Sequence, residues 1–172
     1  MTIKHCVFII VMTIAGFNCS AQEFYHTIGA QYLQANGTYG NYDRLSCQYA
    51  PQIHLEKKSL IYAVSMPMTF GLVTSSARSD SRPVLEVPVM LELGYNPAAP
   101  CINYKSMSFF VGAGVSKQIL PELTGQQALF YNGVAGWRLM IMKVPFEIRV
   151  TGSRSFVNQS PMRIGFGIAT EL

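Results

Sequence analysis

Charged side chains that could form ion pairs recur at alternate positions within several apolar stretches. Glu86 and Glu92 interrupt a run of large apolar residues, and Arg149 follows Glu147 by two positions. Residues two apart on a strand point to the same face of a sheet. Opposite charges withdrawn from water on that face would have to pair with one another. The set predicted to form such a network is Glu86, Glu92, Arg138, Glu147, Arg149, Arg163 and Glu171.

Residues suited to nucleophilic or metal chemistry are few and poorly spaced. Beyond the first 21 residues the histidines are His26 and His54, and neither has a neighbouring serine–aspartate pair or a metal-ligand spacing. No set resembling a catalytic triad can be assembled from them. Cys47 and Cys101 are predicted to fall too far apart to form a disulfide. The sequence therefore predicts no enzyme, no cofactor and no metal site.

The elements that would position the charges show a period of two. Large residues alternate with small or polar ones over Leu60–Leu72, Leu85–Tyr95 and Met162–Glu171, and no helical period fits these windows comparably. Weaker alternation predicts further strands near 24–33, 42–55, 107–117, 129–140 and 146–156. Eight strands of roughly 9–11 residues are typical of an outer-membrane barrel.

Composition limits the class of protein. The chain has 172 residues, of which 13% are charged, about half the ~25% of an average soluble domain, and 49% are hydrophobic. A net charge of +4 is too small to indicate a nucleic-acid partner. Residues 1–21 carry Lys4 and then an apolar stretch, the pattern of a secretory signal. We expect residues 22–172 to form a single barrel domain.

Alternation alone does not tell whether the large apolar face points to lipid or into a soluble core. A soluble lipocalin-like barrel that binds a hydrophobic ligand would place this face inward and leave the other face in water. Here the other face carries many small residues, among them Gly112, Gly114, Gly165 and Gly167, between a few charges. Small residues beside long charged ones suit a narrow eight-stranded lumen packed with side chains. This favours lipid on the outside.

Several local features follow from this arrangement. We expect outer loops at 73–83 and 118–127, and inner connections at 56–59, 96–105 and 141–145. Lys117 and Arg154 share the lipid-facing parity near the outer rim, where cations could contact lipopolysaccharide phosphates. Interfacial snorkelling would equally explain them. Prolines 51, 67 and 88 fall inside predicted strands, where we expect bulges or earlier strand ends.

Four segments carry a resemblance to a known family: Gln48–Ile53, Ser65–Gly71, Leu85–Leu91 and Phe109–Val115. They resemble the small outer-membrane β-barrel proteins of Bacteroidetes-type bacteria, and the whole barrel resembles the OmpX and OmpA-transmembrane type. The resemblance implies insertion by the outer-membrane assembly machinery through the last strand. It transfers no catalytic or ligand residue to this chain.

The sequence thus predicts an all-β, eight-stranded antiparallel up-and-down transmembrane barrel in a bacterial outer membrane. Its lumen is expected to be filled, and its function to be structural or interactive, with the two outer loops as contact surfaces. We expect a monomer surrounded by outer-membrane lipid and no nucleic-acid partner. The soluble lipocalin-like barrel is the alternative.

Overall fold

The computed structural model describes residues 21–37, 40–57, 59–75, 78–97, 107–119, 127–142, 144–156 and 162–172. These residues form one antiparallel sheet, in which consecutive strands are neighbours except β3 and β4, which both lie between β2 and β5. The strands are β1 (Ala21–Gly37), β2 (Gly40–Lys57), β3 (Leu60–Ser65), β4 (Met68–Ser75), β5 (Arg78–Tyr95), β6 (Met107–Ile119), β7 (Gln127–Ile141), β8 (Val144–Ser155) and β9 (Met162–Glu171).

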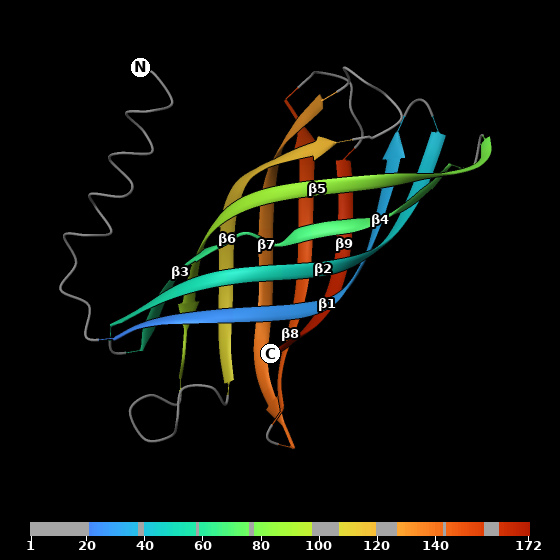
Figure 1. Cartoon of the computed structure of the whole chain (residues 1–172). Helices are drawn as coiled ribbons and strands as arrows, with labels where there is room; N and C mark the ends of the chain where they lie inside the picture. Colours follow the sequence, from blue (N-terminus) through green and yellow to red (C-terminus); the bar gives the residue numbers. More distant parts are fainter. Residues whose placement is uncertain are drawn as a thin grey trace.

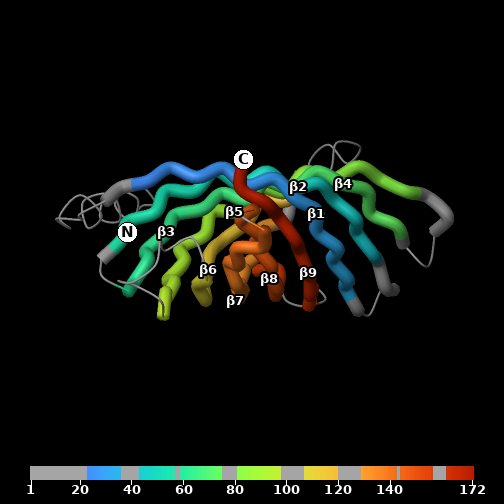
Figure 2. Tube along the Cα trace, turned by 90° about the horizontal axis from the view of Figure 1, so that it is seen from below, coloured from blue at the N-terminus to red at the C-terminus, as the bar shows by residue number. Residues whose placement is uncertain are grey.

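The sheet closes on itself. β1 pairs with β2 on one side and with β9 on the other, from Thr27 opposite Glu171 to Asn36 opposite Met162. The strands on the two sides of the barrel cross at a steep angle (Figure 1), as strands tilted around a barrel axis do. From below, β9 is seen to run beside β1 (Figure 2). β3 and β4 lie end to end between β2 and β5 in a single register, so they count as one interrupted strand of the barrel. The barrel is therefore the predicted eight-stranded antiparallel one, and the fold prediction is confirmed.

The two faces of each strand are as different as the alternation predicted. Leu91 and Ile168 point outward and are about half exposed, at 48% and 47%, whereas Glu86 and Glu92 point into the lumen and are each 4% exposed. The orientation expected for the bulky residues is therefore correct. The soluble alternative required the opposite orientation.

The three prolines of the predicted strands lie close together on neighbouring strands. Pro67 separates β3 from β4, as expected, but Pro51 and Pro88 stay within continuous strands with no register shift, so the bulges expected there are absent. The Pro51 carbonyl accepts a hydrogen bond from the Met66 N–H at 3.0 Å, so the missing donor of Pro51 faces the break in the next strand. The registers on either side of that break place Pro67 opposite Pro88.

Backbone N–H groups of successive residues on a strand point alternately to the two neighbouring strands. Met66 directs its N–H toward β2, so Pro67 faces β5, and the missing donors of Pro67 and Pro88 face each other. Each proline therefore weakens a ladder that is already interrupted at this point, and the β1–β2 and β5–β6 ladders remain continuous.

The prediction of an outer loop at 73–83 is wrong. β4 continues to Ser75 and β5 begins at Arg78, with Thr74 still paired to Ser81 before a register shift. The segment carries polar residues at both odd and even positions, so it lacks the apolar alternation of the other strands. It extends the β4–β5 hairpin beyond the apolar wall. Residues 120–126 of the other expected outer loop lie outside the described residues, as do residues 98–105 of the 96–105 connection and the whole predicted signal except Ala21, which begins β1.

Among the residues that the structure describes, no helix has the length and apolar character needed to cross a membrane.

Close approach of side chains across the lumen depends on glycine. A Cβ built on Gly136 would lie 2.3 Å from the Ile148 carbonyl oxygen and 2.6 Å from the Phe110 ring. Gly133, on the same strand, faces outward, where the nearest atom to an added Cβ is 4.0 Å away.

We therefore expect Gly136→Ala to destabilise the barrel by about 1–3 kcal/mol, the usual cost of overpacking. The matched Gly133→Ala variant should be neutral or slightly stabilising, since alanine reduces the freedom of the unfolded chain. Urea unfolding of the refolded protein, followed by tryptophan fluorescence, measures both. Equal stability of the two variants would mean that the lumen is not tightly packed at Phe110.

Candidate functional site

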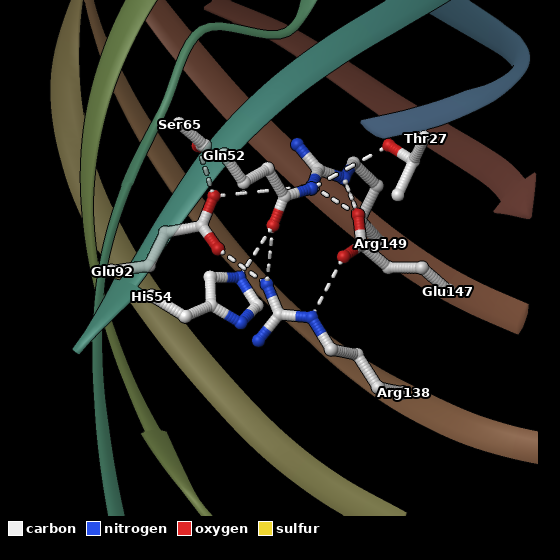
Figure 3. Close-up of polar contacts among 8 residues, drawn as sticks. All are labelled: Thr27, Gln52, His54, Ser65, Glu92, Arg138, Glu147 and Arg149. Atoms are coloured by element: carbon white, nitrogen blue, oxygen red, sulfur yellow. Dashed lines mark hydrogen bonds and ion pairs between the residues drawn. The ribbon is translucent and has the colours of Figure 1, made fainter. Parts of the chain in front are cut away.

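The charged network of the lumen is the only buried constellation of ionisable groups that the described residues form, and it has two parts. The first, the Glu92 cluster, consists of Glu92, Arg138, Glu147 and Arg149, contributed by β5, β7 and β8. Arg138 lies between the two carboxylates (Figure 3), with its Nη2 2.8 Å from Glu92 Oε2 and its Nε 2.9 Å from Glu147 Oε2. Arg149 binds Glu147 through its Nε at 2.7 Å and also through its Nη2. Two positive and two negative charges balance here.

Neutral side chains add hydrogen bonds to this cluster, although Arg138 Nη1 has no partner among the described residues. Ser65 donates to Glu92 at 2.5 Å, and the side-chain oxygen of Gln52 accepts from Arg138 at 3.1 Å. The same oxygen lies 2.9 Å from Nε2 of the buried His54, whose ring lies tilted against the Tyr25 ring with a centroid distance of 4.3 Å. The Arg138 guanidinium also lies 4.3 Å from the centroid of the Phe110 ring. Charges buried at such depth are stable only when their hydrogen bonds are largely satisfied, as they are here.

The second part, the Glu86 cluster, consists of Arg44, Glu86 and Arg163, from β2, β5 and β9. Glu86 binds Arg44 at 2.5 Å and Arg163 at 2.9 Å, and it accepts a further hydrogen bond from Ser116 at 2.6 Å. Arg163 is 1% exposed and lies against the Phe130 ring at 3.5 Å from its centroid. This cluster holds two positive charges and one negative charge.

A small apolar layer separates the two clusters. Met90, Phe110 and Val134 are nearly inaccessible to solvent and contact one another in the lumen. On the side of the chain termini, a cavity of about 50 Å³ is lined by His54, Arg138 and Glu147 among others. A second cavity of about 30 Å³ lies between the clusters. The lumen is thus mostly filled by protein.

The structure brings six of the seven predicted network residues into these two clusters. Glu171, the seventh, is half-buried near the end of β9 and lines the cavity on the terminal side. Arg44 was missed, although a signal was present: it shares its parity with Ser46, Gln48 and Gln52, and all four point inward. The polar stretch around Asp43 hid that alternation. Ser65, Gln52 and Ser116 were missed because polarity alone does not reveal which carboxylate a side chain contacts.

The other singled-out residues lie outside the network. Lys117 and Arg154 are exposed on the outer face, and Arg154 pairs in register with Tyr131. His26 lies on the outer face, with its Nδ1 2.5 Å from the Tyr49 hydroxyl. Cys47 is a free, exposed cysteine there, while Cys101 lies outside the described residues. Among the described residues, no group of three or more His, Cys, Asp or Glu side chains could hold a metal ion.

Comparison with solved structures supports a definite type of barrel. Neisserial surface protein A is similar to this chain, with a TM-score of 0.56 and 10% sequence identity. The similarity covers 89% of this chain and 99% of the neisserial protein. Ail, the attachment invasion locus protein of Yersinia pestis, is similar over 88% and 99% of the two chains, with a TM-score of 0.51 and 15% identity. The fold is that of small outer-membrane β-barrels.

No protein-family model matches this sequence. No curated protein matches it either. At 10–15% identity the similarity establishes the fold and transfers no residue role. The finer resemblance to the Bacteroidetes-type group stays a prediction.

Removing one carboxylate of the Glu92 cluster should be costly. We expect Glu147→Gln to destabilise the barrel by about 3–5 kcal/mol, because it leaves two arginines facing a single buried carboxylate. The double variant Glu147→Gln with Arg149→Gln restores the balance through the Glu92–Arg138 pair, so its loss should be clearly smaller than the sum of the single losses. Urea unfolding of the four proteins of this cycle in the same detergent gives the coupling energy. Additive losses would contradict the arrangement described here.

Proposed function

We propose that this chain is an outer-membrane β-barrel protein of structural or interaction type, with a plugged lumen and no catalysis. The observation that carries the proposal is the outer wall. Large apolar side chains that are about half exposed follow one another around the barrel, including Leu91, Val111, Val150 and Phe166. Soluble proteins rarely expose a continuous apolar surface of this extent. A hydrocarbon surround accounts for it directly.

The height of the apolar wall supports the same proposal. One band of exposed aromatic side chains contains Tyr62, Tyr95, Phe109 and Trp137, in which Tyr95 pairs with Phe109 and Phe109 with Trp137. A second band contains Phe70, Tyr131 and Phe156. Leu85, the register partner of Phe70, lies ten residues from Tyr95 on β5. At about 3.3 Å per residue and a tilt of about 40°, this span is about 25 Å tall, the height of the apolar band of a membrane barrel.

The two ends of the barrel differ in the strand ends and connections that they carry. Ala21 and Glu171 lie at the end where β2 connects to β3 and β7 connects to β8, which we assign to the periplasm. The β1–β2 and β4–β5 hairpins lie at the opposite end, where strands of 17 or 18 residues extend past the apolar wall. We propose that these extensions, together with the 118–127 segment, form the outward contact surface.

Partners follow from the same orientation. Lys117 and Arg154 lie on the outer face toward the extracellular end, where their cationic groups would meet lipopolysaccharide phosphates. We further propose that the chain is inserted by the outer-membrane assembly machinery and works as a monomer. No observation favours the soluble lipocalin-like alternative, because its ligand cavity would require the large apolar face to point inward.

Cell fractionation tests the location. Expressed with its first 21 residues in a Gram-negative host, the protein should be recovered in the outer-membrane fraction. On a denaturing gel its unheated form should migrate differently from its boiled form, since a closed barrel resists the detergent. Recovery in the soluble periplasmic fraction without a mobility shift would contradict the proposal.

A single substitution can distinguish lipid from water as the surroundings of the outer face. Leu91 faces outward about midway between the aromatic bands. In a bilayer, Leu91→Arg should cost about 2–4 kcal/mol. In a soluble barrel the same change at an exposed position would be nearly neutral. Arg154→Leu, at the rim, serves as the control with an opposite change in charge. Unfolding in lipid vesicles measures both, and an unaffected Leu91→Arg variant would argue against lipid at this position.

A further inference from the structure

The second cavity has an unusual lining. It lies in the lumen between the two charged clusters, has a volume of about 30 Å³, and is bordered by four polar residues, Arg44, Gln48, Thr69 and Asn132, among others. Glu86 also lines it, but its carboxylate oxygens are already bound by Arg44, Arg163 and Ser116. About 10–15 Å³ is enough for a water-sized occupant. The space is therefore adequate for a monatomic ion. Because the cavity lies in the lumen, its suitability for an ion does not depend on what surrounds the barrel.

Each of these four residues directs an unmet polar atom into the interior. Arg44 Nε, Gln48 Nε2, Thr69 Oγ1 and Asn132 Nδ2 are buried and have no hydrogen-bond partner among the described residues. Arg44, Gln48 and Thr69 are only 2–3% exposed. The three nitrogens are donors, and the threonine hydroxyl can also donate. Leaving such groups unsatisfied would cost free energy at each one.

The charge balance points the same way. The Glu92 cluster is neutral, but the Glu86 cluster has Arg44 and Arg163 against Glu86 alone. Arginine does not lose its proton in proteins, so the excess positive charge cannot be removed by titration. An uncompensated charge at this depth is strongly unfavourable. The Glu86 cluster therefore carries one local positive charge in excess, and the cavity with the unmet donors borders Arg44, one of its two arginines.

We propose that this cavity binds a small monovalent anion of the chloride type. An anion accepts hydrogen bonds from all four groups and neutralises the excess charge. A single water molecule accepts only two hydrogen bonds and would leave the local excess charge in place. The ion completes the lumen plug at the level of Gln48, Thr69 and Asn132, where protein side chains leave a gap.

Bromide tests the assignment, because it replaces chloride and gives an anomalous X-ray signal. Crystals of the purified barrel grown in sodium bromide should show an anomalous peak in this cavity. At constant ionic strength, bromide or chloride should raise the unfolding temperature relative to gluconate, an anion too large to enter, and the rise should saturate with concentration. A cavity that contains only water, together with equal unfolding temperatures in halide and gluconate, would overturn the proposal.

Substitutions test whether the effect of halide on the unfolding temperature arises in this cavity. Arg44→Met removes the excess charge and leaves the Glu86–Arg163 pair balanced, so the barrel should still fold and the halide effect should disappear. Gln48→Leu keeps every charge but removes one donor and reduces the cavity, and it should also abolish the effect. Arg154→Gln, the control, removes an exposed cation on the outer face and should leave the effect unchanged. A halide response that persists in Gln48→Leu, or that is lost in Arg154→Gln, would place the ion elsewhere and overturn the assignment.

Discussion

Ion pairs across the lumen hold the opposite walls of this barrel together. Glu86 and Glu92 both project from β5, and between them they bind arginines on β2, β7, β8 and β9. A carboxylate in a narrow interior is costly to leave without its partner, so each pair helps to fix the distance and register of the strands that carry it. The small residues of the lumen follow from this constraint. Gly112 and Gly167, for example, lie where a Cβ would press on the stems of Glu92 and Arg149.

The backbone obeys a second constraint, the satisfaction of its own hydrogen bonds. A closed barrel has no edge on which to place a proline, yet three prolines occur in adjacent strands. They align across β2, the β3–β4 break and β5, so their missing donors meet at one interruption. That interruption borders the cavity between the clusters, which Pro67 and Pro88 help to line. The interruption of the hydrogen-bond ladder and a gap in the filling of the lumen therefore coincide.

Much of the fold could be predicted from the sequence because alternation depends only on the surroundings of each strand face. The faces of Leu60–Leu72 and Leu85–Tyr95 differ so strongly that their parity was unambiguous. The 73–83 segment was misassigned because both of its faces are polar, and a strand beyond the apolar wall carries no alternation to detect. Pro51 and Pro88 were misjudged because the consequence of a missing donor depends on which neighbour it faces, and this is set by register. The partners within the network depend on positions across the lumen, which no local pattern contains.

The central claim is that the outer wall contacts lipid while the charges fill the interior, and the single tryptophan offers the most direct test. Trp137 is 44% exposed on the outer wall, in the aromatic band nearest the chain termini. Its fluorescence can be recorded, without any substitution, in vesicles made of lipids brominated at different depths of the acyl chain. The account predicts strong quenching by lipids brominated near the headgroup, weaker quenching by lipids brominated near the chain end, and little quenching by aqueous iodide. Quenching by iodide with no response to brominated lipid would contradict it.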